Sequence, residues 1–122
     1  METGRMFRKR ILVADDEPGV REALRLLLSV DHHTVTEAGD GVAAFDLVTR
    51  HPFDLVITDY EMPRMKGNEL AAKIKAVSPS QPIIMITAYP EKVDNAKNPV
   101  DAILNKPFQF DDLRGAITKV LS

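Results

Sequence analysis

The chain has 122 residues, which is enough for one domain and too few for two. Hydrophobic residues make up 44% and charged residues 28%, a composition typical of globular proteins that excludes general disorder. The net charge of -2 argues against a dedicated binder of nucleic acid or of anionic membranes, and the absence of cysteine excludes disulfides, thiolate catalysis and cysteine zinc sites.

Residues 1–8 are expected to form a solvated leader ahead of a single domain at 9–122. The stretch Met1–Arg10 is basic, like the start of a signal peptide, but acids follow after only four apolar residues, Ile11–Ala14. An apolar signal core and a cleavage site are therefore missing. No apolar run approaches the ~18 residues of a membrane span. We expect a cytoplasmic protein with no membrane partner.

Short apolar runs bounded by polar or turn residues predict five β-strands. They are Arg10–Ala14, a weaker run at Thr34–Glu37, Asp54–Thr58, Pro82–Thr87 and Ala102–Leu104. The first and fourth runs are continuously apolar rather than alternating, which indicates strands covered on both faces, as in a parallel sheet.

Segments with helical periodicity lie between and after the strands. They are Glu17–Val30, Asp40–Arg50, Asn68–Val77 and Gln109–Leu121. The apolar positions expected on their inner faces are Val20, Ala23, Leu24, Leu27 and Leu28, then Val42, Phe45 and Val48, then Leu70, Ile74 and Val77, and finally Leu113, Ile117, Val120 and Leu121. Strands alternating with helices predict repeated βαβ units, with helices on both faces of a parallel sheet. The helix between the fourth and fifth strands is shortened, because Glu91–Asn98 offers at best about two turns.

Polar residues of related chemistry end four of the predicted strands. The ends carry Asp15, Asp16 and Glu17, then Asp59, Tyr60 and Glu61, then Thr87, and then Lys106 before Pro107. Ligands of open parallel sheets bind beyond the carboxyl ends of the strands. If the first and third strands are neighbours, the aspartates crowd together, and charges about 4 Å apart repel by roughly 4 kcal/mol at an effective dielectric of 20. The cluster then needs a proton, a lysine or a hard divalent cation, and its oxygen ligands suit Mg²⁺.

A cation, the lysine and the threonine hydroxyl together would accommodate the oxygens of a phosphoryl group. Asp59 is the best candidate for a carboxylate nucleophile, because it ends a strand rather than starting a helix. Ordinary structural roles compete with this hypothesis. The triplet Asp15–Glu17 would also serve as a helix N-terminal cap, and Asp59, Thr87 and Lys106 taken singly would fit a turn, a strand end and an exposed lysine. Agreement of four strand ends favours a common site.

The order of these motifs resembles the receiver domain of two-component response regulators. The segments that carry the resemblance are Ile11–Glu17, Asp54–Pro63, Ile86–Ala88 and Lys106–Phe108, and the match extends from Lys9 to Leu121. The resemblance implies a flavodoxin-like, doubly wound five-stranded parallel sheet with strand order 2-1-3-4-5. It also implies a cis bond between Lys106 and Pro107.

The same resemblance implies a role for each site residue. Asp59 would accept a phosphoryl group from a phosphohistidine, Lys106 would pair with that group, and Thr87 would move toward it as a switch. Mg²⁺ would be the cofactor. Its ligands would be Asp16 and Asp59 directly, the main-chain carbonyl of Glu61, and Asp15 through water. The partners would be a histidine kinase or histidine phosphotransfer domain and a downstream protein, with no direct nucleic-acid contact.

The sequence departs from the family pattern at three places. Ile103 stands where a switch aromatic is usual, the helix after the fourth strand is short, and Glu61 places a further carboxylate at the mouth of the site. The first two departures predict that a change on phosphorylation stays local, in the loop Ala88–Asn98 with Tyr89 as its main mover.

The sequence therefore predicts a phosphoacceptor receiver that switches a protein-binding surface and is not a turnover enzyme, either standing alone or cut from a longer regulator. Two alternatives remain. A phosphohydrolase of the haloacid dehalogenase type also uses Asp and Mg²⁺, but it requires a second Asp where this chain has Glu61. A receiver-like domain that only binds a partner would not need Asp59, Thr87 and Lys106.

His32, His33 and His51 are expected to be exposed, and Met62, Met65 and Met85 to pack in the interior.

Overall fold

The computed structural model describes residues 8–93 and 100–122. In chain order the elements are β1 (Arg10–Ala14), α1 (Pro18–Val30), β2 (Thr34–Ala38), α2 (Gly41–Arg50), β3 (Leu55–Asp59), α3 (Gly67–Val77), β4 (Ile83–Thr87), η1 (Pro90–Lys92), β5 (Ala102–Asn105) and α4 (Phe110–Leu121). The strands form one parallel sheet in the order β2-β1-β3-β4-β5, which confirms the predicted topology. Of the expected leader, residues 1–7 lie outside the described part.

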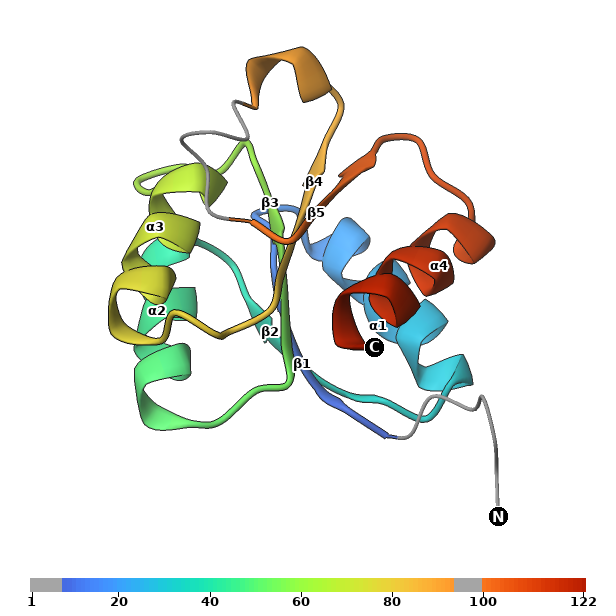
Figure 1. The fold of residues 1–122 in the computed structure, drawn as a ribbon. Coiled ribbons are helices and arrows are strands. Elements are labelled where there is room, and N and C mark those ends of the chain that lie inside the picture. The colour runs from blue at the N-terminus through green and yellow to red at the C-terminus, as the bar shows by residue number, and fades with distance from the viewer. Residues whose placement is uncertain (1–7, 94–99) are drawn as a thin grey trace.

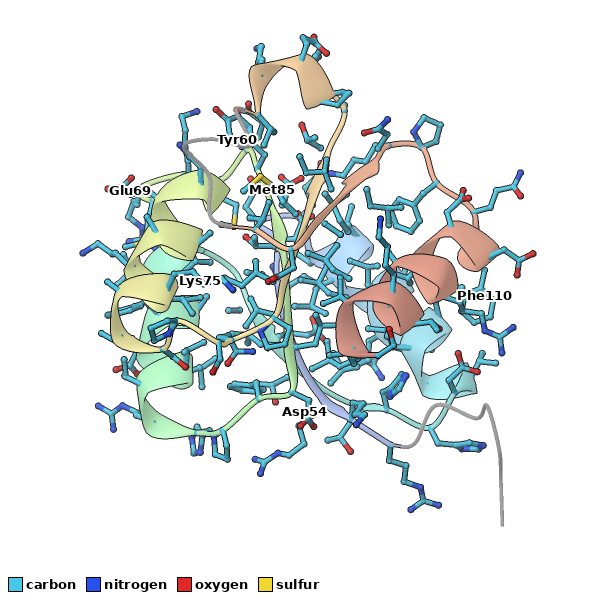
Figure 2. All side chains as sticks on the ribbon, in the orientation of Figure 1. Asp54, Tyr60, Glu69, Lys75, Met85 and Phe110 are labelled. Carbon is cyan, nitrogen blue, oxygen red and sulfur yellow. The ribbon has the colours of Figure 1, made fainter. Side chains whose placement is uncertain are left out.

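The helices form one layer on each face of the sheet. Figure 1 shows α2 and α3 on one side and α1 and α4 on the other, with the strands between them. Side chains fill the space between each helical layer and the sheet (Figure 2). In the part of the chain that the structure describes, no helix is long and apolar enough to cross a membrane.

Alternation along β1 explains why its sequence is continuously apolar. Ile11 and Val13 belong to the core shared with α1 and α4, whereas Leu12 and Ala14 belong to the core shared with α2 and α3. All four are at most 1% exposed. Both faces of the strand are buried, so an apolar residue is required at every position.

Three predicted helix starts are in fact N-cap residues, so each of these helices begins one residue later. Glu17 is the N-cap of α1, Asp40 of α2 and Gln109 of α4. The carboxylate of Asp40 accepts a hydrogen bond from the Ala43 amide at 2.8 Å, and Asp112 accepts one from the Gln109 amide at 2.9 Å. These caps satisfy amides that the first helical turn leaves unpaired.

Some predictions of burial are wrong. Ala23 is exposed on α1, Val42 is 53% exposed near the start of α2, and Val77 is 60% exposed as the last residue of α3. Ala44 and Ala71 occupy the buried positions instead. Near a helix end, a residue on the apolar stripe can extend past the sheet, so the periodicity no longer ensures burial.

His33 is buried, against the prediction of an exposed histidine. It is 7% exposed, and its Nδ1 accepts a hydrogen bond from the Lys9 amide at 3.1 Å. Burial lowers the pKa of His33. The three methionines Met62, Met65 and Met85 are buried, as predicted.

The described start of the segment between β4 and β5 is a three-residue 3-10 helix, η1, followed by the buried Val93. The rest of the predicted short helix, residues 94–98, lies outside the described residues. Ile103 on β5 is half-buried and lies beside Met85 of β4.

Candidate functional site

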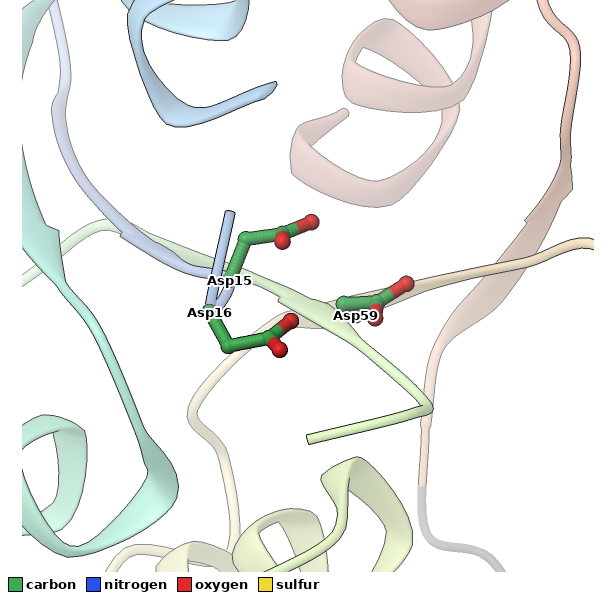
Figure 3. Close-up of side chains that lie close together, drawn as sticks. All are labelled: Asp15, Asp16 and Asp59. Atoms are coloured by element: carbon green, nitrogen blue, oxygen red, sulfur yellow. The ribbon is translucent and has the colours of Figure 1, made fainter. Parts of the chain in front are cut away.

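Three carboxylates converge where β1 and β3 end. Asp15 follows β1 directly, Asp59 is the last residue of β3, and the two strands are neighbours in the sheet. One oxygen each from Asp15, Asp16 and Asp59 lies within 4.8 Å of the others. Figure 3 shows the Asp16 carboxylate directed toward the region between Asp15 and Asp59. The predicted neighbourhood of the two strand ends is therefore present.

Two of the three carboxyl groups are buried, which makes their charges costly. Asp15 is 2% and Asp59 6% exposed, whereas Asp16 is exposed. Burial raises the pKa of Asp15 to about 6, helped by the negative charge of Asp59 and opposed by a hydrogen bond from the Glu17 amide. Burial also raises the pKa of Asp59, although Lys106 opposes the shift. Clustered oxygen ligands that hold excess negative charge fit a hard divalent cation.

Lys106 reaches this cluster from the end of β5. Its Nζ lies 2.9 Å from Oδ1 of Asp59 and 3.9 Å from Oδ2 of Asp15. Burial favours the neutral amine, but the hydrogen bond to Asp59 and the charges of Asp59 and Asp15 raise the pKa of Lys106 overall. The lysine is therefore an ammonium ion at neutral pH. The Lys106–Pro107 peptide bond is cis, as expected.

Thr87 lies at the end of β4 and is 1% exposed. Its carbonyl accepts a hydrogen bond from the Lys106 amide at 2.8 Å, which joins the ends of β4 and β5. Its Oγ1 accepts a hydrogen bond from the amide of Tyr89 at 2.9 Å. The hydroxyl group is thus linked to the segment after β4 that the sequence predicts to respond.

The loop between β3 and α3 is packed tightly against Asp59. Gly67 donates its amide hydrogen to the Tyr60 carbonyl at 2.9 Å, and a Cβ atom on Gly67 would lie 2.2 Å from the Asp59 carbonyl oxygen. The Glu61 carboxylate forms an exposed ion pair with Lys66 at 3.3 Å. The expected metal ligation by the Glu61 carbonyl remains a prediction.

The side chains of the first acidic triplet do not cap α1. In the described part of the chain no side chain caps α1, and Glu17 is its N-cap through the main chain alone. Asp15 instead accepts a hydrogen bond from the Glu17 amide at 2.9 Å, which orders the loop.

Sequence reasoning missed one residue next to this site, Arg21. Its Nη1 donates a hydrogen bond to the main-chain oxygen of Asp15 at 2.6 Å. An available signal was its place one turn into α1, because helical side chains lean toward the N-terminus of their helix and so over the preceding loop.

Comparison with known proteins identifies the family and the fold of this chain. Residues 11–118 match the model of the response regulator receiver domain. Sporulation initiation phosphotransferase F of Bacillus subtilis (strain 168) is 32% identical over 120 residues, which cover 95% of this chain and 96% of that protein. Response regulator MprA of Mycobacterium sp. (strain KMS) is 36% identical over 115 residues, 92% of this chain. The chain spans about half the length of MprA, since the match covers 50% of that protein.

Solved structures agree with the sequence matches. The response regulator TrrA of Thermotoga maritima, solved in complex with Mg²⁺ and BeF, has a TM-score of 0.88 and 36% identity, over 93% of this chain and 99% of that chain. The sheet order, the cluster at its carboxyl edge and the family match lead to one conclusion: this chain belongs to the response regulator receiver domain family.

Proposed function

We propose that this chain is a phosphoacceptor receiver in which Asp59 takes a phosphoryl group from a phosphohistidine. The observation that carries the proposal is the buried Asp59 carboxylate, paired with Lys106 at 2.9 Å and placed within 4.8 Å of two further aspartates. The donor would be a histidine kinase or a histidine phosphotransfer domain, and the output a protein-binding surface read by a downstream protein.

The acidic cluster fits Mg²⁺ as cofactor. The residues that would hold the ion are Asp16 and Asp59 directly, the main-chain carbonyl of Glu61, and Asp15 through a water molecule. When bound, Mg²⁺ neutralises charge on the carboxylates and on the phosphoryl oxygens. The complex of TrrA with Mg²⁺ and BeF, in a chain 36% identical to this one, supports the choice of Mg²⁺ as the ion.

The chemistry at Asp59 is the transfer of a phosphoryl group from an imidazole nitrogen to a carboxylate oxygen. A carboxylate oxygen of Asp59 forms a bond to phosphorus while the phosphorus–nitrogen bond of the phosphohistidine breaks, and the departing imidazole nitrogen keeps the electron pair and takes up a proton. The product is an acyl phosphate on Asp59. Attack by water on phosphorus then releases inorganic phosphate and regenerates the carboxylate.

Two neighbouring groups would stabilise the transferred phosphoryl group. Lys106 gives up its contact with the Asp59 carboxylate and pairs with a phosphoryl oxygen instead, because both are anionic acceptors for the same ammonium. The hydroxyl of Thr87 donates a hydrogen bond to another oxygen. Since Oγ1 of Thr87 also accepts the Tyr89 amide, movement of Thr87 pulls on the start of the loop after β4.

A phosphohydrolase would use the same nucleophile but would release product repeatedly. In this chain the carboxylate two residues after Asp59 belongs to Glu61. Within the described residues, this carboxylate pairs with Lys66 and makes no hydrogen bond to Asp59. We therefore propose a signalling receiver with slow self-dephosphorylation and not a turnover enzyme. Stoichiometric labelling without turnover of phosphate esters would distinguish the two.

Binding of a phosphoryl mimic tests the proposed site. Beryllofluoride with Mg²⁺ should shift the amide NMR signals of Asp59, Thr87 and Lys106 in the wild type, and the shifts should disappear in Asp59→Asn. Equal shifts in both proteins would show that the acceptor is another residue.

A further inference from the structure

Arg21 connects α1 to the main chain of the acidic loop. It lies in the first turns of α1, and its side chain is 18% exposed. Its Nη1 lies 2.6 Å from the main-chain oxygen of Asp15. A hydrogen bond from a guanidinium to a carbonyl is charge-assisted, and partial burial strengthens it because fewer water molecules compete.

The guanidinium of Arg21 is itself held from a second direction. Its Nε lies 3.1 Å from Oε1 of Glu37 on β2, and the other oxygen of Glu37 is taken by Nε of Arg25 at 3.1 Å. The main chain at Gly39 lies close as well, since a Cβ there would be 3.5 Å from Nη1 of Arg21. The guanidinium of Arg21 is therefore held by Glu37 on β2 and lies beside Gly39, the residue directly after β2 in the chain.

The carbonyl that Arg21 contacts belongs to the peptide bond between Asp15 and Asp16. The Asp15 amide donates to the Ala38 carbonyl at 3.1 Å, and the Asp15 carboxylate accepts the Glu17 amide at 2.9 Å. These two bonds hold the peptide groups on either side, and Arg21 holds the peptide group that leads into Asp16. Because Asp16 is exposed, the direction of its carboxylate depends on that peptide.

We propose that Arg21 is a positioning residue for the metal site: oriented by Glu37, it holds the Asp15–Asp16 peptide so that both carboxylates face Asp59. The proposal rests on the proposed function of the acidic cluster as a Mg²⁺ site. It assigns Arg21 a role through the main chain, without contact to the metal or to the phosphoryl group.

The sign of the effect on Mg²⁺ affinity separates positioning from simple electrostatics. Arg21 is a cation that contacts the main chain of the acidic loop, so by charge alone its removal would tighten the binding of another cation there. Loss of positioning acts in the opposite direction, and supporting residues around metal ligands are typically worth 10–100-fold in affinity. We expect Arg21→Ala to raise the dissociation constant for Mg²⁺ by about tenfold.

The experiment is a titration of the full chain with MgCl₂ in the absence of any phosphodonor. Amide NMR signals recorded during the titration give the dissociation constant for Mg²⁺. Arg21→Lys keeps the charge but cannot contact Asp15 and Glu37 with one rigid fork, so its dissociation constant should lie between those of wild type and Arg21→Ala. Arg25→Ala is the matched control. It removes the other arginine on Glu37 without a contact to Asp15, and it should stay within about twofold of wild type.

The outcomes separate this proposal from the proposed function. If wild type and Arg25→Ala bind Mg²⁺ and Arg21→Ala binds as tightly or more tightly, the positioning role is wrong while the metal site stands. If the wild type does not bind Mg²⁺ at all, both proposals fail. If Arg21→Ala does not fold, Arg21→Lys decides, and a dissociation constant equal to wild type overturns the positioning role.

Discussion

Nζ of Lys106 lies 2.9 Å from Oδ1 of Asp59, and this contact connects residues at the ends of β5 and β3, two strands that β4 separates in the sheet. The lysine therefore reaches across the end of β4. In the absence of a phosphoryl group, its ammonium partly compensates two buried carboxylates, those of Asp59 and Asp15. The same position makes Lys106 available to an anionic group attached to Asp59.

Removal of this lysine should change the titration of Asp59. We expect Lys106→Ala to raise the pKa of Asp59 further, because burial then acts without the opposing hydrogen bond and charge. Carbon-13 NMR of the aspartate carboxyl groups as a function of pH measures the shift. Lys66→Ala is the control, since it removes an exposed lysine that pairs with Glu61. An Asp59 titration that is the same in Lys106→Ala and wild type would contradict the account.

The acidic cluster should make the metal-free protein less stable at neutral pH. The pKa of Asp15 is raised to about 6, so the folded state favours its protonated form. The contribution of Asp15 to the free energy of unfolding is therefore fully present below about pH 4 and is lost as the pH rises through 6. Asp15→Asn removes the charge. The variant should be more stable than wild type above pH 6, by on the order of 1–2 kcal/mol, with the difference vanishing near pH 4.

Urea unfolding in EDTA between pH 4 and pH 8 measures this difference. Asp111→Asn, in the exposed first turn of α4, is the control for loss of one negative charge. A constant gap between Asp15→Asn and wild type across the pH range would exclude titration of Asp15 as the cause.

Magnesium binding should depend more on Asp16 than on Asp15. Asp16 is exposed and is proposed as a direct ligand, so Asp16→Ala should weaken binding by about tenfold or more. Asp15→Ala should cost less, because a water molecule is proposed between Asp15 and the ion. Calorimetric or NMR titration with Mg²⁺ compares the two. Wild-type affinity in Asp16→Ala would show that the proposed ligand set is wrong.

Gly67 should tolerate no side chain, whereas Gly115 should. A Cβ on Gly67 would lie 2.2 Å from the Asp59 carbonyl oxygen, so Gly67→Ala forces the backbone of the site apart and should destabilise the protein by about 2 kcal/mol or more. Nothing lies within 4 Å of a Cβ on Gly115 in α4. Gly115→Ala should therefore stabilise by about 0.5–1 kcal/mol, and thermal unfolding of both variants checks the contrast. A Gly67→Ala variant as stable as wild type would contradict the tight packing around Asp59.

Local sequence patterns predicted the sheet well and the surroundings of the site less well. The bounds of β1 agree with the prediction residue for residue, because both faces of that strand are buried and polar residues limit it. The burial of His33 was missed because its partner, the Lys9 amide, lies 24 residues away. Arg21 was missed for a related reason. From the sequence, an arginine on an amphipathic helix is expected to be solvated, and the contact of Arg21 with Glu37 forms only in the folded chain.

The convergence of the strand ends was predictable from the sequence because it follows from parallel topology. Asp15 and Asp59 each end a buried strand, and neighbouring parallel strands end at one edge. The pKa shifts were not predictable in the same way. They depend on the burial of each carboxyl group and on the position of Lys106, and the exposed Asp16 differs from Asp15 although the two are adjacent in sequence.

Intact-mass measurement after incubation with acetyl phosphate and Mg²⁺ tests whether Asp59 is the phosphoacceptor. The wild type should gain one phosphoryl group, the gain should require Mg²⁺, and Asp59→Asn should gain none, because a neutral amide lacks the anionic carboxylate that attacks phosphorus. Asp111→Asn, the same change at an exposed aspartate in the first turn of α4, serves as a matched control and should still be labelled. Equal labelling of wild type and Asp59→Asn would contradict the assignment of Asp59 as the phosphoacceptor.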